Sequence, residues 1–128
     1  NLGNIYQTRG DLAEAEAMYR KSLAIEEALG RKEGMAIDYG NLGIIYKTRG
    51  DLAEAEAMYR KSLAIEEALG RKEGIASDYG NLGNVYQIRG DLAEAEAMYR
   101  KSMELFEQIG AKPDIEQARG LLEGLRKG

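Results

Sequence analysis

Apolar residues follow one another along this chain at the three- and four-residue spacing of an α-helix. Between residues 52 and 69 they are Leu52, Ala55, Met58, Tyr59, Leu63, Ile65 and Leu69. They cover a broad arc of the helix, which implies packing against more than one neighbour. A single pair of helices cannot bury such an arc, so we expect pairs of helices to stack on one another. The pattern predicts an all-α protein.

The pattern repeats with a period of 40 residues, because Asn1-Leu-Gly returns at Asn41 and at Asn81. Segments 4–34 and 44–74 differ at only two positions. Glycines separate the apolar runs, and Gly50 is followed directly by Asp51. Glycine readily adopts the left-handed conformation that ends a helix. Asp51 is expected to cap the next helix, with Glu54 completing a capping box.

This punctuation places two helices in each unit, which we call the A helix and the B helix. The sequence predicts a B helix at about 52–69 and an A helix at about 73–89, with equivalents 40 residues away. Residues 1–9 form the end of a first A helix, and 113–127 form a fourth A helix. The prediction is therefore seven helices, of which the first is incomplete.

The repeated unit resembles the tetratricopeptide repeat. The resemblance rests on Asn41-Leu42-Gly43, Tyr46, Gly50, Ala55, Tyr59 and Leu63, and it extends over essentially the whole chain. The 40-residue unit is similar to the longer-helix subclass found in spindle-orientation adaptors of the Pins type and in many bacterial arrays. Tyr39 and Tyr79 replace the family's favoured tryptophan. The resemblance implies a right-handed α-solenoid of stacked antiparallel hairpins.

In this arrangement the chain divides into units 1–30, with an incomplete A helix, 31–70 and 71–110, followed by a C-terminal capping helix, 111–128. Arg119, Glu123 and Arg126 stand where Tyr79, Gly83 and Tyr86 provide packing in the preceding unit. Charged residues at these positions indicate a helix that ends the stack. Phe106 is expected to pack toward this cap. We expect the chain to be a fragment of a longer array.

Composition argues against several classes of function. The chain has no His and no Cys, which removes the commonest general base and the commonest ligands of zinc. Its net charge of -4 gives no electrostatic reason to bind nucleic acid. No apolar run is long enough to span a membrane. We therefore expect a cytoplasmic protein that is not an enzyme and needs neither a cofactor nor a metal.

The polar residues that could carry chemistry have structural interpretations. Glu66 and Glu67 are neighbours on a helix and point apart, so a solvated helix face is expected. Ser22, Ser62 and Ser102 lie within helices and are expected to be small packing residues. The tyrosines have the spacing of core residues.

A binding surface is expected on the face of the A helix opposite Tyr39, Leu42 and Tyr46. By resemblance to the family, this face lines the concave groove of the superhelix. The predicted partner-binding residues are Asn4, Gln7, Thr8, Ile37, Asn41, Ile44, Lys47, Thr48, Ser77, Asn81, Asn84, Gln87 and Ile88. Segments 35–62 and 75–102 differ at six positions, all on the A helix and four of them on this stripe or its edge.

This clustering suggests either divergence to fit a partner or chance among few substitutions. Some family members clamp a peptide carboxylate with Asn, Lys and Arg, but Ser77 and Asn81 stand where the cations would be. The favoured function is a scaffold that binds a peptide or helix of a partner protein in the groove. The alternative is self-association through repeat ends, as a homodimer through the incomplete N-terminal end or as a filament. A regulatory module of a larger protein is a further reading.

Overall fold

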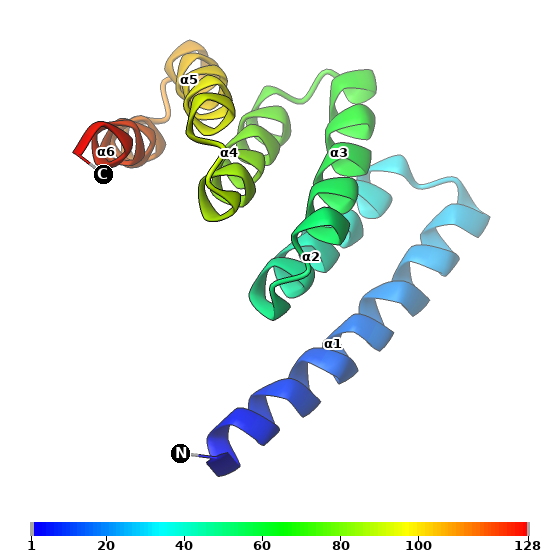
Figure 1. The fold of residues 1–128 in the computed structure, drawn as a ribbon. Coiled ribbons are helices and arrows are strands. Elements are labelled where there is room, and N and C mark those ends of the chain that lie inside the picture. The colour runs from blue at the N-terminus through cyan, green and yellow to red at the C-terminus, as the bar shows by residue number, and fades with distance from the viewer. Residues whose placement is uncertain (1, 128) are drawn as a thin grey trace.

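A computed structural model describes residues 2–127, with side chains described from residue 10 to residue 125. This part of the chain forms six α-helices and no strand: α1 (Leu2–Leu29), α2 (Lys32–Arg49), α3 (Leu52–Leu69), α4 (Lys72–Arg89), α5 (Leu92–Ile109) and α6 (Lys112–Lys127). Successive helices pack against each other along a curved path from α1 to α6 (Figure 1). The predicted α-solenoid is confirmed. No helix in the described range is long and apolar enough to cross a membrane.

The N-terminal part differs from the prediction. α1 runs without interruption through Gly10, so the prediction of seven helices, with a separate one at 1–9, is wrong. The sequence Thr-Arg-Gly-Asp forms a turn at Gly50, where φ is 86°, but stays helical at Gly10. A turn gives up helical hydrogen bonds and is stabilised only when a partner helix folds back. At the Gly50 turn α2 folds back and packs on α3, whereas the residues before Gly10 continue α1 as one helix, and extending an existing helix needs no new nucleus.

The turns between helices use glycines with positive φ, as predicted. At the end of α2, the Gly50 N–H donates to the Lys47 carbonyl at 3.0 Å, and the Asp51 N–H donates to the Tyr46 carbonyl at 2.8 Å. The predicted capping box is wrong, because the Asp51 side chain makes no capping hydrogen bond. Its ψ of 72° lies short of the extended conformation typical of a capping residue.

Tyrosine rings fill the space between the helices of a hairpin. Tyr59 and Tyr99 are fully buried. A Cβ added to Gly43 would lie 2.6 Å from the Tyr59 ring, and one added to Gly83 would lie 2.5 Å from the Tyr99 ring. The glycine of the Asn-Leu-Gly motif is therefore the residue that lets the tyrosine of the following helix approach the A helix.

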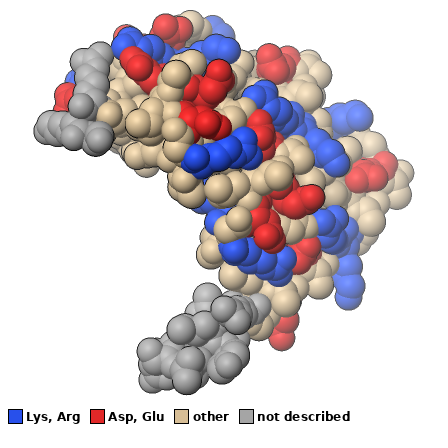
Figure 2. All heavy atoms as spheres, in the orientation of Figure 1, with Lys and Arg blue, Asp and Glu red and all other residues tan. Residues whose placement is uncertain are grey.

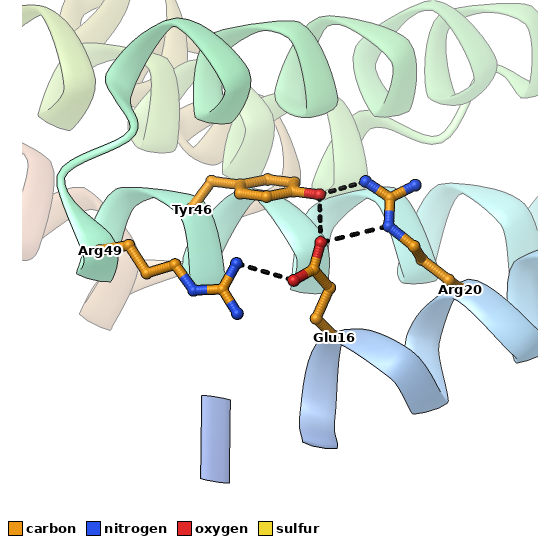
Figure 3. A network of polar contacts seen from close by, with 4 residues as sticks. All are labelled: Glu16, Arg20, Tyr46 and Arg49. Carbon is orange, nitrogen blue, oxygen red and sulfur yellow. Dashed lines mark hydrogen bonds and ion pairs between the residues drawn. The ribbon is translucent and has the colours of Figure 1, made fainter. Parts of the chain in front are cut away.

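A polar network joins α1 to α2 (Figure 3). The Glu16 carboxylate accepts a hydrogen bond from the Tyr46 hydroxyl at 2.6 Å and pairs with Arg49 at 2.7 Å. Arg20 pairs with Glu16 at 3.2 Å and also donates to the Tyr46 hydroxyl. The hydrogen bonds from Tyr46 and Arg49 lower the pKa of Glu16 from 4.5 to about 2.

The same network joins α3 to α4, where its members are Glu56, Arg60, Tyr86 and Arg89. We call each set a joint network. Glu56 and Arg60, four residues apart on α3, pair at 3.3 Å, and this pair is one part of a larger arrangement that reaches the next unit. The two joints hold successive units in the same relative position.

α6 packs against α5, and its bounds agree with the predicted helix at 113–127. Ala118 and Leu122 are buried, whereas Arg119 and Glu123 are exposed. Phe106 is buried and lines a cavity together with Ala118, as expected for packing toward the cap. The Arg126 side chain lies outside the described side chains.

Candidate functional site

Two cavities follow one another between the A helices. The first, of about 350 Å³, lies between α2 and α4 over α3, and we call it the α2–α4 compartment. The second, of about 200 Å³, lies between α4 and α6 over α5, and we call it the α4–α6 compartment. Together they are the groove. The outline of the molecule is hollowed on one side, and acidic and basic residues are interspersed over the face in view (Figure 2).

The two compartments are built from equivalent positions 40 residues apart. Ala36, Ile37, Gly40, Asn41, Ser62 and Glu66 in the first correspond to Ala76, Ser77, Gly80, Asn81, Ser102 and Phe106 in the second. Ser77 and Asn81 line both compartments, so the groove is continuous across α4. Repetition of the unit has thus produced a row of equivalent sites.

The groove contains part of the predicted partner-binding stripe. Five of the thirteen residues line it: Ile37, Asn41, Ser77, Asn81 and Asn84. Ile44, Lys47, Thr48, Gln87 and Ile88 lie on α2 and α4 but line neither compartment. Asn4, Gln7 and Thr8 have side chains outside the described range. The role of all thirteen as partner contacts stays a prediction.

Two of these residues also have an internal partner that the sequence did not indicate. The Tyr99 hydroxyl lies 2.6 Å from Asn84 Oδ1 and 2.8 Å from Gln87 Oε1, and its single proton serves one of them at a time. In the preceding unit the equivalent residues are Ile44 and Lys47, and the buried Tyr59 hydroxyl has no hydrogen-bond partner. Differences between the copies therefore change the support of the core as well as the surface.

A buried carboxyl in the first compartment was missed at the sequence level. Asp78 is buried and accepts a 2.8 Å hydrogen bond from Ser62 Oγ. Burial raises the pKa of Asp78 to about 7, although the bond from Ser62 opposes this. The Ser22–Asp38 pair is the same contact one unit earlier, so these serines hold polar partners rather than only filling space. The sequence contains a signal for this burial, because Asp78 lies four residues before the buried Leu82 and therefore on the same face of the helix.

Glu66 corrects a second expectation, because it does not belong to a solvated face. Its side chain is buried, whereas Glu67 is exposed. Gly74 provides the room, since a Cβ there would lie 1.3 Å from Glu66 Oε2. Burial raises the pKa of Glu66, and Arg71, which pairs with it at 3.3 Å, opposes the shift. The signal in the sequence is Phe106, an aromatic residue at the equivalent position.

The second compartment has lost these carboxyls. Ala118 stands at the position of Asp78, and Phe106 at that of Glu66. Ser102, without an aspartate, donates instead to the Ala76 carbonyl at 2.8 Å. Asp114, at the position of Gly74, is the only charged residue among the described residues that line this cavity. The groove therefore passes from a compartment lined by three carboxyls and one cation to a compartment lined by a single carboxyl.

The described side chains include no group of three or more His, Cys, Asp or Glu residues that could hold a metal ion. The groove offers amides, carboxyls and apolar surface. Amides both donate and accept hydrogen bonds, as the backbone of an extended peptide requires.

Comparisons with known proteins agree with this architecture. A family model described as tetratricopeptide repeat matches residues 1–68 and 39–108. The fold is similar to the crystal structure of BtubC (BKLC) from P. vanneervenii, with 21% identity, a TM-score of 0.68, and coverage of 98% of this chain and 61% of that one.

It is also similar to a P. anserina chain assigned as a kinesin light chain with nearly identical TPR-like repeats. There the identity is 21%, the TM-score 0.77, and the coverage 97% of this chain and 62% of that one. This chain thus spans about three-fifths of the length of these two structures. No curated protein matches the sequence.

Proposed function

The chain belongs to the tetratricopeptide repeat family, whose members are generally non-enzymatic protein–protein interaction modules, and we propose that it binds an extended peptide of a partner protein in the groove. The observation that carries this proposal is the continuity of the groove. Two compartments of equivalent residues share Ser77 and Asn81, so one strand of peptide crossing α4 would contact both. The 40-residue unit also supports a likeness to adaptors of the longer-helix subclass.

The side chains along the groove suit a peptide backbone. Asn41 and Asn81 recur one unit apart and are only partly buried, so their amides are available to peptide N–H and carbonyl groups. Ile37 is 56% exposed beside Asn41 and offers an apolar contact. Apolar anchors among hydrogen-bonding groups are typical of protein interfaces.

Selection from a displayed library of random peptides tests the proposal. Peptides of about 12 residues, which span roughly 40 Å when extended, are selected on the whole chain. Asn81→Lys places a long charged side chain where the two compartments meet. It should weaken the binding of the selected peptides by about a hundredfold, or roughly 3 kcal/mol. The matched control is Gln108→Lys, an exposed position that does not line the groove. Undiminished binding to Asn81→Lys would contradict the proposal.

Self-association is a second candidate, favoured by one observation on α1. Met18 is 69% exposed, whereas the equivalent Met58 is 7% exposed. α2 folds back on α3 and covers the face that contains Met58, but α1 continues straight through Gly10 and leaves its own face open. An exposed apolar face of this kind favours association.

A further inference from the structure

The two compartments of the groove differ in charge at equivalent positions. Glu66, Glu73 and Asp78 line the α2–α4 compartment, and Arg71 is the one cation among the described residues that line it. In the α4–α6 compartment the positions of Glu66 and Asp78 are occupied by Phe106 and Ala118. The two compartments therefore present different charges to a side chain that enters them.

The carboxyls of the first compartment have oxygen atoms that accept no hydrogen bond from the described residues. Asp78 makes no ion pair with any described Lys or Arg, and its hydrogen bond from Ser62 engages Oδ2 and leaves Oδ1 free. Arg71 bonds to Oε1 of Glu66 and also pairs with Glu33, so it does not neutralise Asp78. Burial raises the pKa of both carboxyls, which a cation inside the compartment would reverse.

The second compartment has less charge and offers apolar contacts beside its polar groups. Phe106, Ala118 and Leu121 are among its lining residues, Asp114 is its one carboxyl, and Ser102 is already satisfied by the Ala76 carbonyl. A cavity of about 150 Å³ is sufficient to hold a benzene ring, so the 200 Å³ here accommodates an aromatic or long aliphatic side chain. Asn81 at the same cavity remains available to the peptide backbone, whereas Asn84 Oδ1 accepts a hydrogen bond from the Tyr99 hydroxyl.

Resting on the proposed function, we infer that the groove selects peptides with a lysine or arginine and a large apolar residue at a fixed separation. The basic side chain enters the α2–α4 compartment and contacts Asp78 and Glu66. The apolar side chain enters the α4–α6 compartment against Phe106. The chain thus recognises a basic–apolar pair.

The selected peptides provide the first test. Among those that need Asn81, we expect a shared Lys or Arg and a shared Phe, Tyr, Leu or Met at a constant spacing. Asp78→Asn and Glu66→Gln keep the size and hydrogen bonding of each side chain while removing its charge, and each should weaken binding about tenfold. Glu67→Gln is the matched control, because it removes the same charge from the neighbouring exposed position, and it should change binding by about twofold at most.

A transplant variant tests the assignment of each compartment without depending on loss of binding. Phe106→Glu, Asp114→Gly and Ala118→Asp together copy Glu66, Gly74 and Asp78 into the equivalent positions of the second compartment. Selection on this variant should replace the apolar residue of the motif by a second basic residue. Circular dichroism establishes that each variant is folded.

The outcomes separate the two proposals. If Asn81-dependent peptides lack a basic residue and bind Asp78→Asn and Glu66→Gln as well as the parent chain, the inferred preference is wrong and the groove function stands. If no selected peptide depends on Asn81, both fail. An unchanged motif on the transplant variant also overturns the inference.

Discussion

Two tyrosines at equivalent positions show how single residues change the stability of each unit. The Tyr99 hydroxyl is supported by Asn84 and Gln87, whereas the Tyr59 hydroxyl is buried without a partner. A buried polar group without a hydrogen bond costs about 1–3 kcal/mol. Because the two rings are otherwise held alike, the difference resides in positions 44 and 47, where Ile and Lys replace Asn and Gln.

The double substitution Ile44→Asn and Lys47→Gln should therefore stabilise the protein. It gives the Tyr59 hydroxyl the partners that Tyr99 has, and the free energy of unfolding should rise by about 1 kcal/mol. Urea denaturation measures the change. The reverse pair, Asn84→Ile with Gln87→Lys, is the matched control and should lower the free energy of unfolding by a similar amount. A double variant no more stable than the parent chain would show that the Tyr59 hydroxyl is already satisfied.

At the scale of helices, the sequence predicted most of the architecture. It missed the continuity of α1 and the burial of two carboxyls. Periodicity and turn glycines predicted α2 to α6 to within a residue or two, because each has a full partner helix. The fusion at Gly10 was missed because the same Thr-Arg-Gly-Asp sequence tolerates both outcomes and tertiary packing decides between them. The buried Asp78 and Glu66 were missed because their burial depends on Ser62 and Gly74 of other helices.

The joint between α1 and α2 makes a prediction about pH. The folded pKa of Glu16 is about 2, below the ordinary 4.5, so its contribution to stability is present above pH 4.5 and is lost as the pH falls toward 2. Tyr46→Phe removes the largest cause of this shift. The variant should be less stable than the parent chain by about 1 kcal/mol at pH 6, and the gap should narrow by pH 2.

Thermal unfolding monitored across this pH range makes the measurement. Tyr39→Phe is the control, since among the described residues no side chain makes a hydrogen bond to the Tyr39 hydroxyl, and it should show no such trend. A gap for Tyr46→Phe that stays constant from pH 6 to pH 2 would show that the hydrogen bond does not hold the carboxylate charged.

At the scale of the whole molecule, the two ends of the array differ. Met18 and Ile25 on α1 are exposed apolar residues, whereas α6 presents Arg119 and Glu123. Glu123 occupies the position at which Gly83 admits the Tyr99 ring, so α6 cannot receive a tyrosine in the same way. Under the self-association proposal, we therefore expect an α1 face to pack on another α1 face rather than on α6, which would give a closed two-fold dimer.

Light scattering over a concentration series should show a dimer at high micromolar concentration. Met18→Lys should shift the chain to a monomer because it places a charge in the apolar contact. Leu92→Lys, which alters an exposed apolar residue away from α1, should leave the dimer intact. A parent chain that stays monomeric would argue against association through the exposed α1 face. An assembly whose size keeps growing with concentration would argue against a closed dimer.

The joint networks have a consequence for how such a chain changes over generations. The contacts of Glu16 with Tyr46 and of Glu56 with Tyr86 are the same contact one repeat apart, so removing or duplicating one whole repeat reconnects a B helix to an equivalent A helix. Recombination between nearly identical coding segments makes such changes in single events. The array is therefore able to gain or lose one groove compartment at a time, so the length of the groove would change in whole steps while every junction keeps its structure.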